Sequence, residues 1–352
     1  MDIQLMSLQF VTLSPLHHGF TEPVDYGFRG AKYRAVRQTR IVMPQDDGNG
    51  HITMRAVTVP VLGANALRGR LRRYLAYETF RLLGLDPQSM TPQNTSKLAF
   101  HTLTSGGALV AQDKTKKDQA SDWTQFPAYR QHCLAQWPLL SLMGFSLKDF
   151  MVPSKLRVSF GWPLIKTLQP LVSIAEDTTY GLFPTEWADI KPSDLIQGDG
   201  KDPEAFHMEY KHADTHVMPM QAAGAGAVDR DTEYAAMVMA MQYVPTNVPF
   251  GVRLTALNLT PLEASALRLG LEAAFPRQDT ILFGGRAVTG LGLMRVTNHS
   301  GIETLPDPDI YRDFLRDHRD ALLTQIADSK KFFTDAEVLK MLKAKSEKKK
   351  EV

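Results

Sequence analysis

Four arginines fall within six residues in the segment RGRLRR, residues 68–73. The spacing around them predicts a helix that begins near Asn65, after a glycine-containing loop. Free N–H groups at the N-terminus of a helix bind phosphate, and arginine adds planar, bidentate contacts to the same group. Arg68 and Arg72 are four residues apart and share one face of that helix. The sequence therefore predicts a phosphate site formed by Asn65, Arg68 and Arg72, with a solvated helix face as the alternative.

A second candidate site is the glycine-rich segment FGGRAVTGLG, residues 283–292. It lacks the Lys-Ser/Thr pair of a P-loop, and a strand is predicted after it, whereas a dinucleotide site needs a helix there. Glycine allows a backbone to approach a phosphate or a sugar closely. We predict ligand contacts from Gly284, Gly285, Arg286 and Thr289. A tight hairpin without a ligand is the alternative.

A pair of histidines, His17 and His18, ends the first predicted strand. Catalysis would need a neighbouring nucleophile or base, and none is evident nearby. A metal site would need a third histidine or a carboxylate at ligand spacing, which the sequence does not offer. We interpret the pair as polar groups that line a binding groove, with ordinary surface residues as the alternative. Neither a cofactor nor a metal ion is expected.

The composition is that of a folded protein: the 352 residues are 43% hydrophobic and 22% charged, with a net charge of +2. The single cysteine, Cys133, excludes a disulfide framework and a cysteine-based zinc site within the chain, and it favours a cytoplasmic location. No apolar run approaches the roughly 18 residues of a membrane helix. The first residues, MDIQLMSLQF, alternate as a strand does and do not resemble a secretion signal.

The elements that must position these residues follow from periodicity. Residues 3–13 predict a strand, and the next twenty or so predict a loop. Residues 36–43 and 51–59 predict a hairpin around QDDGNG, whose Asp-Gly and Asn-Gly pairs are turn signals. A helix is predicted from Asn65 to Leu83. Two poorly patterned stretches follow, at 87–122 and 185–232, and loops of such length are usually functional or disordered.

The last third of the chain is patterned more clearly. Strands are predicted at 234–244 and 250–257. Thr260 then begins a helix as its N-cap, with Pro261 at the first position and Glu263 completing a capping box. The glycine segment lies between two further strands, and two weakly amphipathic helices are predicted within 308–347. Together these elements predict an α+β domain with helices on one face of an antiparallel sheet.

Two segments resemble motifs of one protein family. The first, VPVLGANALRGRLRR, resembles the strand–loop–helix of the RAMP superfamily of CRISPR proteins, and the second, LFGGRAVTGLGLMRV, resembles that superfamily's C-terminal glycine-rich loop. The matching positions are Gly63, Leu67, Arg68, Gly69 and Arg72, then Gly284, Gly285, Gly290 and Gly292. Between them, PLLSLMGFS resembles a short segment of the backbone subunits, although Met143 replaces the usual Phe. The segments LSPLHHG and SGGALVAQ favour the type IV form.

The resemblance implies an RRM/ferredoxin-like core, or palm, formed by residues 1–84 and 154–300. It implies an inserted finger segment at 85–153, a thumb at 200–233 and a helical tail at 301–352. The thumb residues that would wedge between bases are His216, Val217, Met218, Met220 and Gln221. The finger residues that would contact the backbone are Ser105, Gly106 and Gly107.

The resemblance also implies a function without catalysis. Each copy would bind about six nucleotides of guide RNA (crRNA), and copies would stack head to tail along it with other CRISPR effector subunits. The target nucleic acid would be read by base pairing, with DNA favoured over RNA. Asp25 is the only acid near the position of the cleaving aspartate in type III relatives, and the pattern around it does not match.

Two other functions are compatible with parts of the sequence. A RAMP endoribonuclease that processes guide RNA or cleaves target RNA would use His17 or His18 as its acid or base, but a neighbouring base or lysine is missing. A stand-alone RNA binder of RRM type would carry aromatic pairs on its central strands. The strand MVMAMQYVP has Met and Ala instead, which disfavours that alternative.

Overall fold

The computed structural model describes residues 2–25, 32–46, 48–86, 96–106, 135–147, 150–164, 168, 209–210, 238–239, 244, 246–284 and 291–328. Its helices are α1 (Ala64–Leu82), α2 (Lys97–Ser105), α4 (Pro138–Met143), α5 (Pro261–Ala274), α6 (Asp309–Asp317) and α7 (Arg319–Ala327). The strands of the main sheet are β1 (Ile3–Thr12), β8 (Leu156–Val158), β9 (Trp162–Pro163), β12 (Pro249–Leu257), β13 (Thr280–Leu282) and β14 (Leu293–Ser300). The remaining strands form two-stranded pairs: β2 (Gly19–Asp25) with β3 (Lys32–Val36), β4 (Gln38–Asp46) with β5 (Ile52–Pro60), β6 (Phe145–Leu147) with β7 (Phe150–Val152), and β10 (Glu209–Tyr210) with β11 (Val238–Met239).

The main sheet is antiparallel, with the strand order β13-β14-β1-β12-β8, and β9 also pairs with β12. The strand β1 pairs on both sides with strands from the last third of the chain, β12 and β14, so the sheet joins segments that are far apart in the sequence. Met6, Leu8 and Phe10 of β1 are buried against the helices, whereas Leu5, on the opposite face, is 63% exposed. The period-two pattern seen in the sequence therefore selects the face that meets the core.

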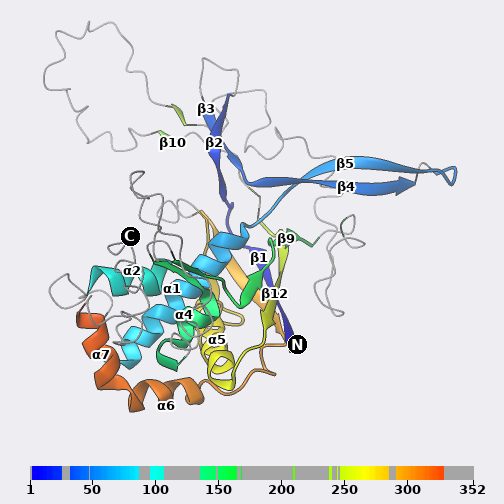
Figure 1. The fold of residues 1–352 in the computed structure, drawn as a ribbon. Coiled ribbons are helices and arrows are strands. Elements are labelled where there is room, and N and C mark those ends of the chain that lie inside the picture. The colour runs from blue at the N-terminus through cyan, green and yellow to red at the C-terminus, as the bar shows by residue number, and fades with distance from the viewer. Residues whose placement is uncertain are drawn as a thin grey trace, which may run out of the picture.

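The helices α1 and α5 lie on that one face of the sheet, and α4 and α6 pack against these two helices (Figure 1). Leu67, Leu71, Leu75 and Phe80 of α1 are all buried, as their helical spacing predicts. The capping box of α5 is present, because the Thr260 side chain accepts from the Glu263 amide and the Glu263 carboxylate accepts from the Thr260 amide. These features confirm the predicted fold class, an α+β core with an antiparallel sheet.

The segment between β1 and α1 forms two hairpins. The β4–β5 hairpin confirms the expected turn at QDDGNG and projects from the body of the molecule (Figure 1). The β2–β3 hairpin corrects the expectation that residues 14–34 form a loop. Its strand GFTEPVD contains Gly, Pro and acidic residues, which predict loops, and its register shift between Gly19 and Pro23 breaks the strand pattern.

The C-terminal helices belong to the same core. Tyr311 of α6 is fully buried, and its hydroxyl lies 3.1 Å from the Thr79 hydroxyl of α1. Leu322 and Ile326 of α7 are buried as well. The division into palm, finger, thumb and tail stays a prediction, and most of residues 200–233 lies outside the described residues. Within the described part of the chain, no helix combines the length and apolarity needed to cross a membrane.

Candidate nucleic-acid interface

The N-terminus of α1 has unpaired amides at its first positions. Gly63 is the N-cap; it supplies no side chain, and the first turn contains no acidic residue. The amides of Ala66 and Leu67 donate to the Gly63 carbonyl at 3.0 and 3.1 Å, so the amides of Ala64 and Asn65 have no acceptor within the helix. Asn65 is exposed beside them. This end of α1 carries the positive end of the helix dipole and outward-pointing donors, as an anion site requires.

His18 holds this helix end next to the glycine segment. Its Nε2 accepts a 2.8 Å hydrogen bond from the Gly63 amide, and its ring lies 5.4 Å from the ring of Phe283. A Cβ on Gly63 would lie 2.7 Å from the same Nε2, so only glycine allows this approach. The two segments that share a motif resemblance, more than 200 residues apart, thus meet through one histidine.

The hydrogen bond also fixes the charge of His18. A ring nitrogen that accepts a hydrogen bond carries no proton, so the proton of the neutral ring is on Nδ1. Burial, with smaller contributions from the charges of Arg37 and His17, lowers the pKa of His18 to about 4. His18 is therefore neutral at physiological pH and serves to position Gly63, which revises its expected role as a polar group facing the ligand.

His17 is 4% exposed and also acts on the glycine segment. Its carbonyl oxygen lies 2.6 Å from the point that a Cβ on Gly284 would occupy, and Gly284 has a φ of 92°. Gly292, at the other end of the segment, has a φ of 81°, and its amide donates to the Pro15 carbonyl at 2.8 Å. The glycines are therefore required where the segment crosses the end of β1. We call the region formed by His18, Gly63, Ala64, Asn65 and Gly284 the helix-end site.

Arg72 does not have the predicted role of a phosphate contact. It is 4% exposed, and its Nη2 donates to the carbonyls of Met143 at 2.6 Å and Gly144 at 2.5 Å. Burial lowers its pKa to about 10, with the charge of Arg68 as the second cause. The guanidinium thus satisfies the C-terminal carbonyls of α4, where a cation also interacts favourably with the helix dipole.

The neighbouring arginines share this structural use. Arg68 is half-buried and donates from Nη2 to the Met143 carbonyl at 3.2 Å. Arg70 donates from Nε to the Ala274 carbonyl, the end of α5, at 2.8 Å and from Nη1 to the Leu282 carbonyl at 2.9 Å. Arg70 also lies over the Tyr74 ring, 4.3 Å from its centroid. Of the four arginines, only Arg73 is exposed.

The structure brings together only some of the predicted ligand contacts. His17, His18, Asn65 and Gly284 lie at the helix-end site, with Arg68 one turn further along α1. Gly106 ends α2 with a φ of 87° and packs against the Arg72 guanidinium, and Ser105 is exposed beside it. The remaining candidates lie outside the described residues: Gly107, Gly285, Arg286, Thr289, His216, Val217, Met218, Met220 and Gln221.

Arg37 is a member of this region that the sequence does not single out. Its side chain approaches Gly63, because a Cβ there would lie 3.4 Å from its Cδ and Nε. Its backbone amide donates to the His18 carbonyl at 2.7 Å, and its carbonyl accepts from the Val61 amide at 2.9 Å. An isolated arginine at the start of a predicted strand carries no motif, so only the fold reveals it.

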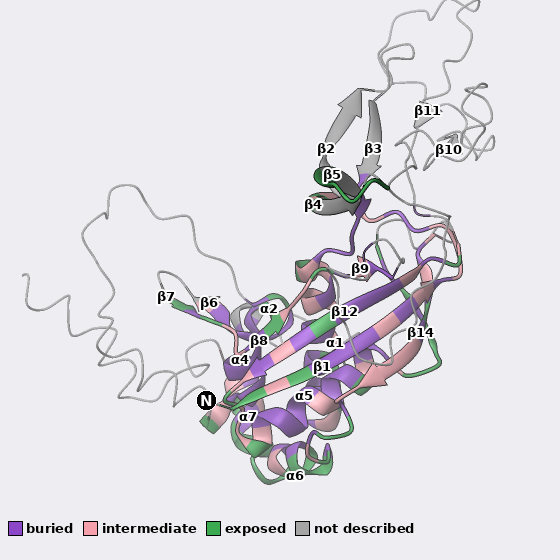
Figure 2. Cartoon of the chain, turned by 90° about the vertical axis from the view of Figure 1, so that its right-hand side faces the viewer, coloured by how far each residue is buried: buried purple, intermediate pink, exposed green. Residues whose placement is uncertain are grey.

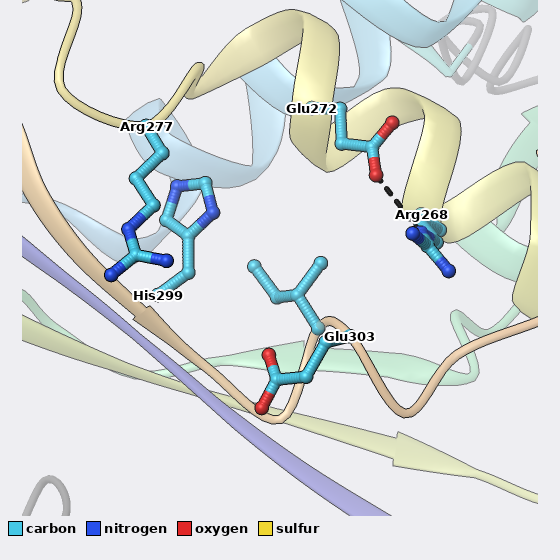
Figure 3. Close-up of a pocket in the computed structure, with 6 residues that line it drawn as sticks. Arg268, Glu272, Arg277, His299 and Glu303 are labelled. Atoms are coloured by element: carbon cyan, nitrogen blue, oxygen red, sulfur yellow. Dashed lines mark hydrogen bonds and ion pairs between the residues drawn. The ribbon is translucent and has the colours of Figure 1, made fainter.

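A second group of charged side chains lies between α5 and β14 (Figure 3). Arg277, His299 and Glu303 face a hollow there, while Arg268 is paired with Glu272 at 2.9 Å. The hollow has a volume of about 130 Å³, below the roughly 300 Å³ of typical small-molecule sites. It does not have the size of a cofactor pocket, and among the described residues no cluster of three or more His, Cys, Asp or Glu could hold a metal ion.

The chain was compared with known proteins. No family model matches it, and no curated protein matches it in sequence. It is similar to a solved chain titled "Type IV-B CRISPR Complex", with 14% sequence identity and a TM-score of 0.43. The similarity covers 83% of this chain and 89% of that chain.

Proposed function

We propose that the protein is a guide-RNA-binding backbone subunit of a CRISPR ribonucleoprotein complex, of the type IV form. Copies of it would bind along the guide RNA with other effector subunits and present the guide for pairing with a DNA target. In this role the protein contacts phosphates and sugars, and base pairing supplies the sequence specificity.

The observation that carries the proposal is the meeting of the two motif segments at the helix-end site. His18 contacts Gly63 through a hydrogen bond and Phe283 through its ring, and the His17 backbone contacts Gly284. The two histidines thus anchor the N-terminus of α1 and the start of the glycine segment to the same stretch of chain. This arrangement suits a sugar-phosphate backbone, because the free amides of the first turn are donors that do not select a base.

The electrostatics of α1 favour an anionic ligand at this end. The first turn has no acid, Asn65 is exposed, and the half-buried Arg68 lies one turn along the helix. Arg70 and Arg72 each donate to two carbonyl oxygens, whereas Arg68 donates to one, at the longer distance of 3.2 Å. We therefore assign the phosphate contact to the amides of Ala64 and Asn65, the Asn65 side chain and Arg68.

The state of the histidines supports a role without catalysis. The Nε2 of His18 is occupied by the Gly63 amide, the pKa of His18 is lowered to about 4, and His17 is buried. A general acid or base needs a ring nitrogen within reach of the substrate and a pKa near the operating pH. We therefore expect no cleavage of guide or target strands, which incubation of labelled RNA and DNA with and without magnesium would test.

The binding site is tested by Asn65→Asp. An acid in the first turn stabilises a helix by about 0.3–1 kcal/mol, so this variant is expected to fold at least as well as the wild type. The same charge repels a phosphate. Loss of one charge-assisted hydrogen bond, about 1.5 kcal/mol, should weaken guide-RNA binding roughly tenfold. The log–log salt slope should fall by about 0.7 for the lost contact.

The matched control is Ala321→Asp, which adds the same charge in the first turn of α7 at an exposed position. It should leave both affinity and salt slope unchanged. Fluorescence anisotropy with guides of unrelated sequence, at several salt concentrations, measures both quantities. Equal affinity and slope for Asn65→Asp and the wild type would show that the helix-end site does not bind the guide.

A further inference from the structure

The face of the main sheet that is turned away from the helices has an unusual charge distribution. Figure 2 shows β1, β12 and β14 in front of the helices, so that this face is toward the viewer. The strands β1, β8, β9, β12, β13 and β14 contain three arginines and no aspartate or glutamate. We call this side of the sheet the open face.

All three arginines lie on the open face. Strand pairing places Arg253 opposite Ser7, Arg157 opposite Thr255 and Arg295 opposite Val11. Residues that pair across antiparallel strands point to the same side, and these positions alternate with the buried residues Leu8, Leu254 and Val296. Each arginine is exposed. The open face is therefore positively charged from β8 across to β14.

The same face carries an aromatic pair at its β9 edge. Trp162 pairs with Gly251 of β12, on the same side as Arg253 two residues further on. Phe160 is 39% exposed, and its ring meets Trp162 edge-on, with the ring centroids 6.1 Å apart and an interplanar angle of 90°. Arg253 is tied to this edge, because its amide donates to Ser159 Oγ at 2.9 Å. Guanidinium groups and aromatic rings thus lie next to one another.

This edge continues into the helix-end site. Gly161, between the two aromatic residues, exchanges backbone hydrogen bonds of 2.9 and 3.0 Å with Leu62, the residue before Gly63. A Cβ on Gly161 would lie 2.7 Å from the Leu62 side chain, so glycine is required for this contact. The aromatic pair is therefore joined directly to the residue that precedes the N-cap of α1.

We propose that the open face is a second binding surface for single-stranded nucleic acid, on which Phe160 and Trp162 stack a base and Arg253, Arg157 and Arg295 contact phosphates. An exposed phenylalanine and a partly buried tryptophan lie beside arginines, on strands that contain no acidic residues. Such features are those of surfaces that bind single strands with little sequence preference. A second copy of the chain would need complementary acids or an uninterrupted apolar patch, whereas the arginines divide the exposed apolar residues of this face. The surface adjoins the helix-end site at Gly161 and Leu62 but is formed by other residues, and it does not require the proposed guide-binding function.

The test uses the full chain and a labelled 12-nucleotide oligouridine, with oligodeoxythymidine as the DNA arm. Phe160→Ala should weaken binding about tenfold, the effect of removing one stacking partner. Arg157→Gln with Arg253→Gln should lower the salt slope by about 0.7 per lost phosphate contact. The control Arg312→Gln removes an exposed arginine from α6 and should change neither quantity. The two arms identify whether RNA, DNA or both bind.

A second readout reports contact directly. Base stacking on Trp162 should quench its fluorescence, so Trp162→Phe should bind nearly as tightly as the wild type while losing part of the quenching. Unchanged affinity in Phe160→Ala, with unchanged salt slope in the double arginine variant, would overturn the proposal. The proposal would also be overturned if these variants lost self-association but kept their affinity for the oligonucleotide, and the face would then be a protein contact. Asn65→Asp changes the helix-end site and leaves the open face intact. Its effect on guide binding therefore tests the helix-end site alone, and the variants of the open face test the second surface.

Discussion

The protonation of His18 makes the stability of the fold depend on pH in a predictable way. At neutral pH its Nε2 accepts the Gly63 amide, and burial lowers its pKa from 6.5 to about 4. Protonation would replace the acceptor with a donor and place a charge beside Arg37. We expect the folded state to lose stability as the pH falls from 6.5 toward 4, because the unfolded chain binds a proton at this residue and the folded chain does not.

The magnitude follows from the two pKa values. The shift from 6.5 to about 4 corresponds to about 3 kcal/mol when the pH lies below both values. At pH 5 the linkage relation gives a loss of about 2 kcal/mol from this residue, compared with its contribution at pH 7.5. The stabilisation is complete above the unfolded pKa, and it is lost through the interval between the two values.

The measurement compares the wild type with His18→Gln. The Gln Oε1 can accept the Gly63 amide and does not titrate. Urea unfolding at several pH values between 5 and 7.5, followed by circular dichroism, should show that the wild type loses about 2 kcal/mol more than the variant between pH 7.5 and 5. At pH 7.5, His18→Phe should be less stable than His18→Gln by about 1–3 kcal/mol, because the Gly63 amide then has no acceptor. Parallel pH curves for the wild type and His18→Gln would refute the assignment.

Two further predictions each compare a substitution with a matched control on α1. Arg72→Met should lower the free energy of unfolding by about 3 kcal/mol, because the carbonyls of Met143 and Gly144 lose their donor, whereas Arg73→Met at an exposed position should stay within about 0.5 kcal/mol. Equal melting temperatures for the two variants would contradict the structural role of Arg72. Gly292→Ala should be strongly destabilising, because its φ is 81° and its Cβ would lie 2.0 Å from the Phe283 carbonyl oxygen. In contrast, Gly69→Ala within α1 should stabilise the protein by about 0.5–1 kcal/mol, because the nearest atom to the new Cβ would be 3.6 Å away. If thermal denaturation shows that both glycine variants raise or both lower the melting temperature, the predicted difference between Gly292 and Gly69 is wrong.

Much of the fold could be predicted because local signals agree with the tertiary structure. The alternation in β1, the turn residues of the β4–β5 hairpin and the capping box at Thr260 each act within a few residues, and each appears where expected. The helix α2 was not predicted, since its sequence KLAFHTLTS is short and is surrounded by polar residues that predict a loop. The β2–β3 hairpin was missed for the similar reason that its composition suits a turn region.

The candidate site was predictable only in part. Its glycines and histidines were identified from the sequence, but the use of Arg72 was not, because its acceptors, Met143 and Gly144, lie 71 and 72 residues away in the chain. Four arginines in one turn and a half of helix suggest a surface, and nothing local reveals that the fold supplies carbonyl groups to one side. Phe160 and Trp162 were overlooked because β9 is only two residues long.

The β4–β5 hairpin has a consequence for how the molecule opens. It is a two-stranded ribbon, and its side chains Val42, Ile52 and Met54 are exposed. Its base is held by the core through Val59 and Ile41, whereas the outer part is a two-stranded ribbon, which is only marginally stable in water. The amide hydrogens of the outer part therefore exchange through local opening and not through unfolding of the whole chain. A partner that covers those apolar side chains would slow this exchange without changing the exchange of β1 or α5. A decrease in the hydrogen-exchange rate that is confined to residues 38–46 and 52–60 thus distinguishes a subunit whose hairpin is bound in an assembly from an isolated subunit.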